Sequence, residues 1–199
     1  MPTVVTHAIV AAGLYRFVAG PHDAANGARR WGIVAAAALA MLPDADVAGW
    51  NVIARDSMLW HRGLTHSLAW AVVTGTATAW ALRHRVRHHG GTAWLAVNFA
   101  ACVATHGLLD AFTDGGSGVG FLLPFDDARM RFAIQPIPVA PITVDPTNHR
   151  ALYCIGVEAI LLWPLAIAMG TAHRAMPWWL RGVVFAAVLY SAWEWAGRS

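Results

Sequence analysis

His106 and Asp110 are the residue pair in this sequence with the clearest capacity for chemistry. On a helix, residues four apart emerge from one face about one turn from each other, so the two side chains can reach the same metal ion. An imidazole and a carboxylate suit zinc or another borderline divalent cation. The pair alone could equally be a hydrogen-bonded structural contact. The case for a metal site therefore depends on further ligands that converge on it.

Two aspartates, Asp44 and Asp46, form a second cluster. Pro43 should help to end the preceding helix, which leaves these carboxylates in a turn where one or both can point into a polar pocket. The alternative interpretation is that they only solvate the end of a helix.

Two histidines, His61 and His66, form a third cluster. Gly63 lies between them and allows a tight bend that would bring the imidazoles together. Thr65 or Ser67 can cap the helix that follows, and surface histidines beside such a cap are the alternative interpretation. A further histidine, near the start of an apolar segment at the N-terminus, is an additional ligand or a packed core residue. It is His7.

Composition places these clusters in a membrane protein. Hydrophobic residues make up 57% of the chain and charged residues 13%, so too few polar side chains remain to cover a soluble globule. A formal net charge of only +3 and this hydrophobicity exclude intrinsic disorder, a disulfide-stapled secreted module and a conventional nucleic-acid-binding protein. The length of 199 residues predicts one domain over residues 1–199.

Apolar runs close to the roughly 20 residues that cross a bilayer predict five strong helices and a weaker sixth. We therefore expect an all-α, polytopic helical membrane protein. The weaker run, 4–18, has no basic residues before its apolar core, which favours a retained spanning or interfacial helix over a cleaved signal peptide. The five stronger runs cover 31–47, 67–82, 92–109, 151–170 and 177–195.

The connections between these runs predict the orientation. Arginines crowd the connections before 31–47, after 67–82 and before 177–195, which favours the cytoplasmic side of the membrane for these three. The histidine and aspartate clusters would then face outward. The connection at 112–150 is too long for a turn, and we expect a long outward loop that forms a lid or a wall of the active site.

The clusters together offer ligands for one metal site or two. A carboxylate such as Asp110 can bridge two ions, which would bind a phosphoryl group and generate a nucleophilic hydroxide. Arg62 and Arg131 are candidates for holding a phosphate, with a solvent-facing arginine as the alternative for each. Glu158 lies within an apolar run and is a candidate general base, a further ligand or a hydrogen-bonded structural carboxyl.

These strings resemble the YdjM-type inner-membrane proteins that are described as membrane-bound metal-dependent hydrolases. The resemblance covers most of the chain through Pro138. It rests on Leu42-Pro43-Asp44-Ala45-Asp46, on His61-Arg62-Gly63-Leu64-Thr65-His66-Ser67, on His106-Gly107-Leu108-Leu109-Asp110 with Thr113 and Gly115, and on Leu123-Pro124-Phe125 with Arg131.

That family is distantly similar to the zinc-dependent phospholipase C and nuclease P1 group, which are helical enzymes with clustered zinc ions. The similarity implies two neighbouring metal sites that share one carboxylate, with Asp110 as the bridge to a second ion held by His7. It implies that the first ion is bound by Asp44, one of His61 and His66, His106 and Asp110. The soluble group completes its cluster with a His-x-x-x-Glu pair that this sequence lacks, and Asp46 and the second of the two histidines are the candidate replacements.

We therefore expect a membrane-embedded metal-dependent hydrolase, and in particular a phosphoesterase that acts on a phospholipid or a lipid-linked phosphate. One to three divalent ions are expected, with zinc first and manganese as the alternative. Asp46 or Glu158 would assist proton transfer, and no nucleic-acid partner is expected. The alternatives are an amide or ester hydrolase, a metal-binding transporter and a membrane scaffold. The expected metal ligands are His7, Asp44, His61, His66, His106 and Asp110.

Overall fold

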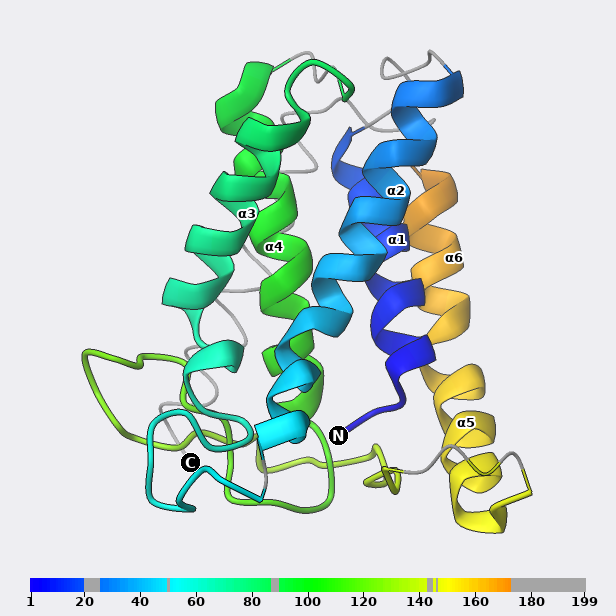
Figure 1. The fold of residues 1–199 in the computed structure, drawn as a ribbon. Coiled ribbons are helices and arrows are strands. Elements are labelled where there is room, and N and C mark those ends of the chain that lie inside the picture. The colour runs from blue at the N-terminus through cyan, green and yellow to red at the C-terminus, as the bar shows by residue number, and fades with distance from the viewer. Residues whose placement is uncertain (20–25, 50, 87–89, 143–144, 146, 173–199) are drawn as a thin grey trace.

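Helices form nearly all the regular structure of this chain, and no strand forms among the residues that the structure describes. The computed structural model describes residues 1–19, 26–49, 51–86, 90–142, 145 and 147–172 (Figure 1). The α-helices are α1 (Val4–Ala19), α2 (Asn26–Met41), α3 (Leu68–Leu82), α4 (Gly91–Ala111), α5 (His149–Leu161) and α6 (Trp163–Ala172). Two 3₁₀-helices, η1 (Leu42–Gly49) and η2 (Leu64–His66), complete the elements. The all-α class expected from the sequence is confirmed.

The helices lie where the apolar runs predict them. Three helical stretches are long and apolar enough to cross a membrane within the described part of the chain: Ala28–Gly49, Gly91–Ala111 and His149–Thr171. The run expected at 151–170 is divided into α5 and α6, because Pro164 lacks the N–H that would continue the helix. The run expected at 177–195 lies outside the described residues.

The bundle is held together by close contacts between helix backbones. In Figure 1, α3 lies against α4, and α6 runs beside α1. A Cβ atom at Gly13 would collide with the carbonyl oxygen of Ala166 in α6, and one at Gly75 would collide with the backbone nitrogen of Ala100 in α4. Such small residues let apolar helices approach closely, as is typical inside membranes. Large apolar side chains remain exposed on the outer helix faces, among them Val34, Val73, Trp80, Ile160 and Ile167.

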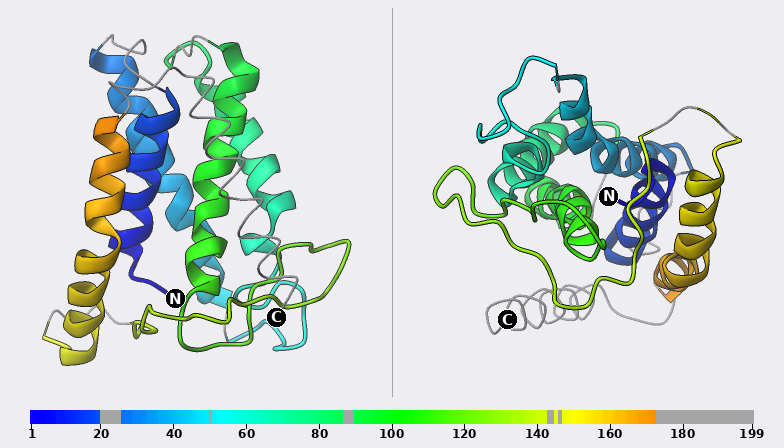
Figure 2. Two further views of the ribbon diagram at one scale, coloured as in Figure 1. Left: turned by 180° about the vertical axis from the view of Figure 1, so that it is seen from behind. Right: turned by 90° about the horizontal axis from the view of Figure 1, so that it is seen from below.

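The long connections gather at one end of the bundle, together with the N-terminus (Figures 1 and 2). At this end α1 and α3 begin and α2 and α4 end. Ser67 caps α3 here by accepting a hydrogen bond from the backbone N–H of Trp70 at 3.1 Å. All the clusters of histidine and aspartate found in the sequence therefore reach the same end of the molecule, which we call the loop end.

The loop between α4 and α5 crosses the loop end and is tied to the bundle by backbone hydrogen bonds. Phe132 N–H donates to the carbonyl of Ala111 at 3.0 Å, and Ala140 N–H donates to the carbonyl of Met1 at 3.0 Å. Phe125 is 88% exposed at the surface of this loop. The loop is therefore placed as a wall over the helix ends.

Glu158 anchors the start of α1. Its fully buried carboxylate accepts hydrogen bonds from the backbone N–H of Thr3, at 2.9 and 3.1 Å, and from the Thr3 hydroxyl. The carbonyl of Thr3 in turn accepts from the N–H of His7 at 3.2 Å in the first turn of α1. Of the roles expected for Glu158, this geometry shows the hydrogen-bonded structural carboxyl. These hydrogen bonds join Glu158 to Thr3 and not to the histidines and aspartates at the loop end.

Replacing Glu158 should destabilise the protein by removing the acceptor for these donors. We expect Glu158→Leu to lower the free energy of unfolding by about 1–3 kcal/mol, because a buried N–H and hydroxyl lose their partner. Glu158→Gln should cost less, since its amide oxygen can still accept one bond. Thermal unfolding of the detergent-purified protein measures both, with Ile160→Leu on the exposed face of α5 as the control. A Glu158→Leu protein as stable as the wild type would contradict this role.

Candidate metal centre

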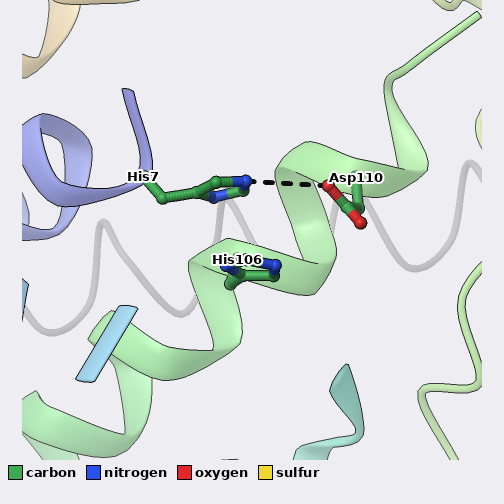
Figure 3. A group of neighbouring side chains, drawn as sticks. All are labelled: His7, His106 and Asp110. Atoms are coloured by element: carbon green, nitrogen blue, oxygen red, sulfur yellow. Dashed lines mark ion pairs between the residues drawn. The ribbon is translucent and has the colours of Figure 1, made fainter. Parts of the chain in front are cut away.

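Six side chains with metal-ligating atoms meet at the loop end, and we call them the His–Asp cluster. They come from α1, η1, the segment before α3 and the last turns of α4. They form two groups of three, and within each group the ligand atoms lie within 4.8 Å of one another. Figure 3 shows the first group. The groups are His7, His106 and Asp110, and Asp44, His61 and His66.

Local sequence explains how these separate stretches come together. Pro43 follows the last residues of α2, and there the chain tightens into η1, which carries Asp44. Gly107 lies next to the first α4 ligand, and a Cβ atom at this position would lie 2.8 Å from the carbonyl oxygen of His66. A glycine here therefore allows the segment before α3 to pack against α4.

His106 is oriented by a backbone carbonyl. Its Nδ1 lies 2.6 Å from the carbonyl oxygen of Ala40, which can only accept a hydrogen bond, so Nδ1 carries the proton of this bond. In the neutral ring Nε2 is then unprotonated, and it faces Asp44 Oδ1 at 3.1 Å. Two acceptors at this distance require either a proton between them or a bound cation. A metal-bound histidine is typically oriented by such a bond from its other nitrogen.

His66 is oriented in the same way by a side chain. Its Nδ1 lies 2.9 Å from Thr65 Oγ1, and the Thr65 hydroxyl donates its one proton to Asp46 Oδ2 at 2.8 Å. The proton of the first bond therefore belongs to His66, which leaves Nε2 unprotonated. This Nε2 has no hydrogen-bond partner and lies 3.6 Å from Asp110 Oδ2 and 3.7 Å from Asp44 Oδ1. Burial lowers the pKa of His66, which favours the neutral form that binds metals.

His61 is the third histidine with an orienting partner. Its Nδ1 lies 2.9 Å from Asp46 Oδ1, and a carboxylate on the Nδ1 side fixes the ring and makes the opposite nitrogen a stronger donor to a metal. Asp46 thus contacts both His61 and Thr65, and its side chain is only 2% exposed. Its position is that of an orienting residue behind the cluster.

His7 is buried without any such partner. Neither ring nitrogen of His7 has a hydrogen-bond partner, although the side chain is fully buried. Its ring stacks on His106, with centroids 3.7 Å apart and planes 15° apart, and its Nε2 points toward Asp110 Oδ1 at 3.7 Å (Figure 3). Two stacked imidazoles disfavour a proton charge on both rings at the same time.

Asp110 lies between the two groups of the cluster. Its carboxylate is fully buried, and neither oxygen accepts a hydrogen bond. Oδ1 faces His7, while Oδ2 faces His66 at 3.6 Å and Arg62 Nε at 3.1 Å. A carboxylate with one oxygen toward each group occupies the position that a bridging ligand requires.

The cluster fits a divalent metal ion. Buried polar atoms in proteins nearly always have hydrogen-bond partners, yet six such atoms in this cluster have none. Neighbouring nitrogen and oxygen atoms lie 3.1–3.7 Å apart, and two ligands about 2.1 Å from a tetrahedral ion would be about 3.4 Å apart. Imidazole and carboxylate ligands suit zinc, and carboxylate also suits manganese. The unpartnered atoms are Nδ1 and Nε2 of His7, Nε2 of His66, Oδ2 of Asp44 and both carboxylate oxygens of Asp110.

Arg62 is buried and bonded to the protein itself. Besides its ion pair with Asp110, it donates from Nη1 to the carbonyl of Gly115 at 2.6 Å and from Nη2 to Thr113 Oγ1 at 2.8 Å. Its backbone φ is 64°, a left-handed conformation that is uncommon for a residue with a side chain and is often found at functional sites. These bonds give Arg62 a positioning role toward Asp110 and the loop wall, which differs from the phosphate-holding role expected from the sequence.

The other arginine predicted for the site lies apart from these contacts. Arg131 is exposed, and no hydrogen bond or ion pair joins it to the His–Asp cluster within the described part of the chain. Its expected role in holding a phosphate stays a prediction.

Two contributors to the site carry no clear signal in the sequence. The carbonyl of Ala40 orients His106, and any residue type provides a backbone carbonyl. Thr65 was expected as a helix cap, but its hydroxyl joins His66 to Asp46. Its place in the same short string as both histidines is the one signal that could have indicated this.

Removing the ion pair behind Asp110 should weaken metal binding. We expect Arg62→Met to reduce zinc affinity by about 10- to 100-fold, because groups that orient a ligand contribute by this amount. Competitive titration with a zinc-chelating dye measures the effect, and Arg131→Met, which alters an exposed arginine, is the matched control. Unchanged affinity in a folded Arg62→Met protein would show that Arg62 does not position Asp110.

Comparison with known proteins gives a consistent assignment. The family model described as YdjM inner membrane protein matches residues 1–198. The chain is also similar to a protein of Escherichia coli (strain K12) described as inner membrane protein YbcI, with 35% identity over 191 residues that cover 91% of this chain and 99% of that protein. No solved structure matches the chain.

Proposed function

The chain belongs to the YdjM inner membrane protein family. We propose that it is a metal-dependent hydrolase of the inner membrane. Its expected substrate is a phosphate ester of a phospholipid or of a lipid-linked compound. The observation that carries the proposal is the set of buried ligand atoms in the His–Asp cluster that have no hydrogen-bond partner.

The two groups of the cluster would hold neighbouring ions, with Asp110 placed to bridge them. When bound, a divalent ion supplies Lewis acidity, which polarises a phosphoryl oxygen and makes water a better nucleophile at neutral pH. Zinc is the first candidate because imidazoles dominate the ligand set, and manganese is the alternative.

The surrounding residues would orient the ligands and handle the proton. Asp46 holds His61 directly and His66 through the Thr65 hydroxyl. With His66 as the histidine ligand from this segment, Nε2 of His61 is left to take a proton from the attacking water. The buried Asp46 carboxylate at Nδ1 of His61 would stabilise the charged ring, whereas Glu158 is bonded to Thr3.

The position of the cluster favours an outward-facing site and a lipid substrate. Arg29 and Arg30 in the first turns of α2, and Arg83 and Arg85 after α3, belong to the end of the bundle opposite the cluster. By the preference of arginine for the cytoplasmic side, the loop end would face the periplasm of a multi-pass protein. A site at the end of a bundle with exposed apolar faces lies near the level of lipid headgroups.

The clustering of all six ligands at one end also favours hydrolysis over transport. A metal transporter would need ligands along its path through the bilayer, and the described helices carry this group only at the loop end. The distant similarity to the zinc-dependent phospholipase C and nuclease P1 group stays a prediction, as does an amide or ester as the substrate.

Asp46→Asn should separate proton transfer from metal binding. We expect the zinc- or manganese-loaded wild type to hydrolyse bis(p-nitrophenyl) phosphate or phosphatidic acid in detergent. At a metal concentration that saturates both proteins, the variant should react about 10²-fold more slowly, the usual contribution of an acid–base group. Asp126→Asn, in the exposed part of the loop, is the control.

Two outcomes would contradict the proposed function. One is that the metal-loaded wild type hydrolyses no phosphate ester in such a screen. The other is that Asp110→Asn hydrolyses these esters at the wild-type rate.

A further inference from the structure

A cavity of about 500 Å³ lies beside the His–Asp cluster at the loop end. Its volume falls within the roughly 300–1,000 Å³ of typical small-molecule sites. Its lining includes His61 and Arg62 together with the apolar segment 139–142 of the loop. The cavity therefore joins a polar wall that contacts the cluster to an apolar wall.

The cavity is where the cluster can be reached from outside. The side chain of His61 is 13% exposed, whereas those of the other five members are 0–7% exposed. His61 lines the cavity, and so does Arg62, whose Nε lies 3.1 Å from Asp110 Oδ2. A molecule in the cavity therefore meets the accessible edge of the cluster.

The apolar wall is held in place by hydrogen bonds of its own backbone. Val139 N–H donates to Asp114 Oδ1 at 2.8 Å, and Ala140 N–H donates to the carbonyl of Met1 at 3.0 Å. At its end Ile142 is 49% exposed, so the apolar surface continues from the cavity to the outside of the protein. Trp60 lines the cavity and follows Met58 and Leu59, which are 48% and 49% exposed.

Taking the substrate class from the proposed hydrolase, we propose that this cavity binds the headgroup-proximal part of an anionic phospholipid. The phosphate would lie toward His61, at the polar wall next to the accessible edge of the His–Asp cluster. The first part of an acyl chain would lie along Val139 and Ile142 and leave over the exposed rim. A water-soluble phosphate would make no contact with this apolar wall and rim. A phospholipid at the surface of the inner membrane carries both a phosphate for the polar wall and an acyl chain for the apolar one.

Photo-crosslinking tests this proposal without requiring activity. The probe is a phosphatidic acid with a diazirine near the start of one acyl chain, in phosphatidylcholine vesicles that contain the full-length protein. Mass spectrometry then maps the labelled residues. We expect label on Trp60 and on 139–142, and we expect unlabelled phosphatidic acid, but not glycerol phosphate, to remove it.

Variants that fill the cavity should lose this label. We expect Val139→Trp, or Ile142→Trp at the rim if the first variant does not fold, to reduce labelling at Trp60 about tenfold, equivalent to a tenfold loss of affinity. The matched control is Ile160→Trp on α5, where the native side chain is 77% exposed.

Three results would overturn the proposal: label confined to the outer faces of the helices, equal competition by glycerol phosphate, and full labelling in the filled variants. The hydrolase proposal fails separately. If the protein is labelled in the cavity but hydrolyses no phosphate ester, the lipid site stands and the hydrolase proposal fails. If it hydrolyses phosphate esters but carries no label in the cavity, the hydrolase proposal stands and the lipid site fails.

Discussion

The Asp110 carboxylate is the constraint on which the loop end depends. It is fully buried, neither oxygen accepts a hydrogen bond, and His7, His66 and Arg62 surround it. Burying a charge is costly unless it is paired, and breaking such a pair is more costly still. Arg62 supplies one positive charge, but the histidine nitrogens around Asp110 offer lone pairs to the same space. A bound divalent cation would satisfy the carboxylate and the imidazoles together.

The rest of the structure brings these groups together and fixes their protonation. Glycines at the α1–α6 and α3–α4 contacts let the helices approach closely. Glu158 binds Thr3, whose carbonyl accepts from His7, and so fixes the position of His7 in the first turn of α1. Three different groups hold Nδ1 of the other histidines: the carbonyl of Ala40, the Thr65 hydroxyl and the Asp46 carboxylate. Each bond directs the opposite nitrogen, Nε2, as a potential ligand, which is the usual arrangement of histidines around a metal.

Much of this arrangement follows from the sequence, and the remainder depends on three-dimensional contacts. Hydropathy predicts the helices because apolar length is a property of each segment by itself. Helical spacing places His106 and Asp110 on one face, and the structure brings His7 to the same place. The role of Arg62 could not be read from its type, because a guanidinium beside a phosphate and one beside Asp110 look the same in a sequence. The same is true of Glu158, whose partner Thr3 is 155 residues away. Pro164 indicates a break between α5 and α6, but the continuous hydropathy of 151–170 predicts a single helix there.

The most direct test of the central claim is the metal content of the purified protein. Inductively coupled plasma mass spectrometry should be applied to wild type, His106→Ala, Asp110→Ala and, as a control in the exposed loop, Asp127→Ala, each with a matched check of folding. The account predicts zinc or manganese in stoichiometric amount in the wild type and in Asp127→Ala, and its loss from both cluster variants. A folded wild type that remains free of metal after reconstitution with either ion would contradict it.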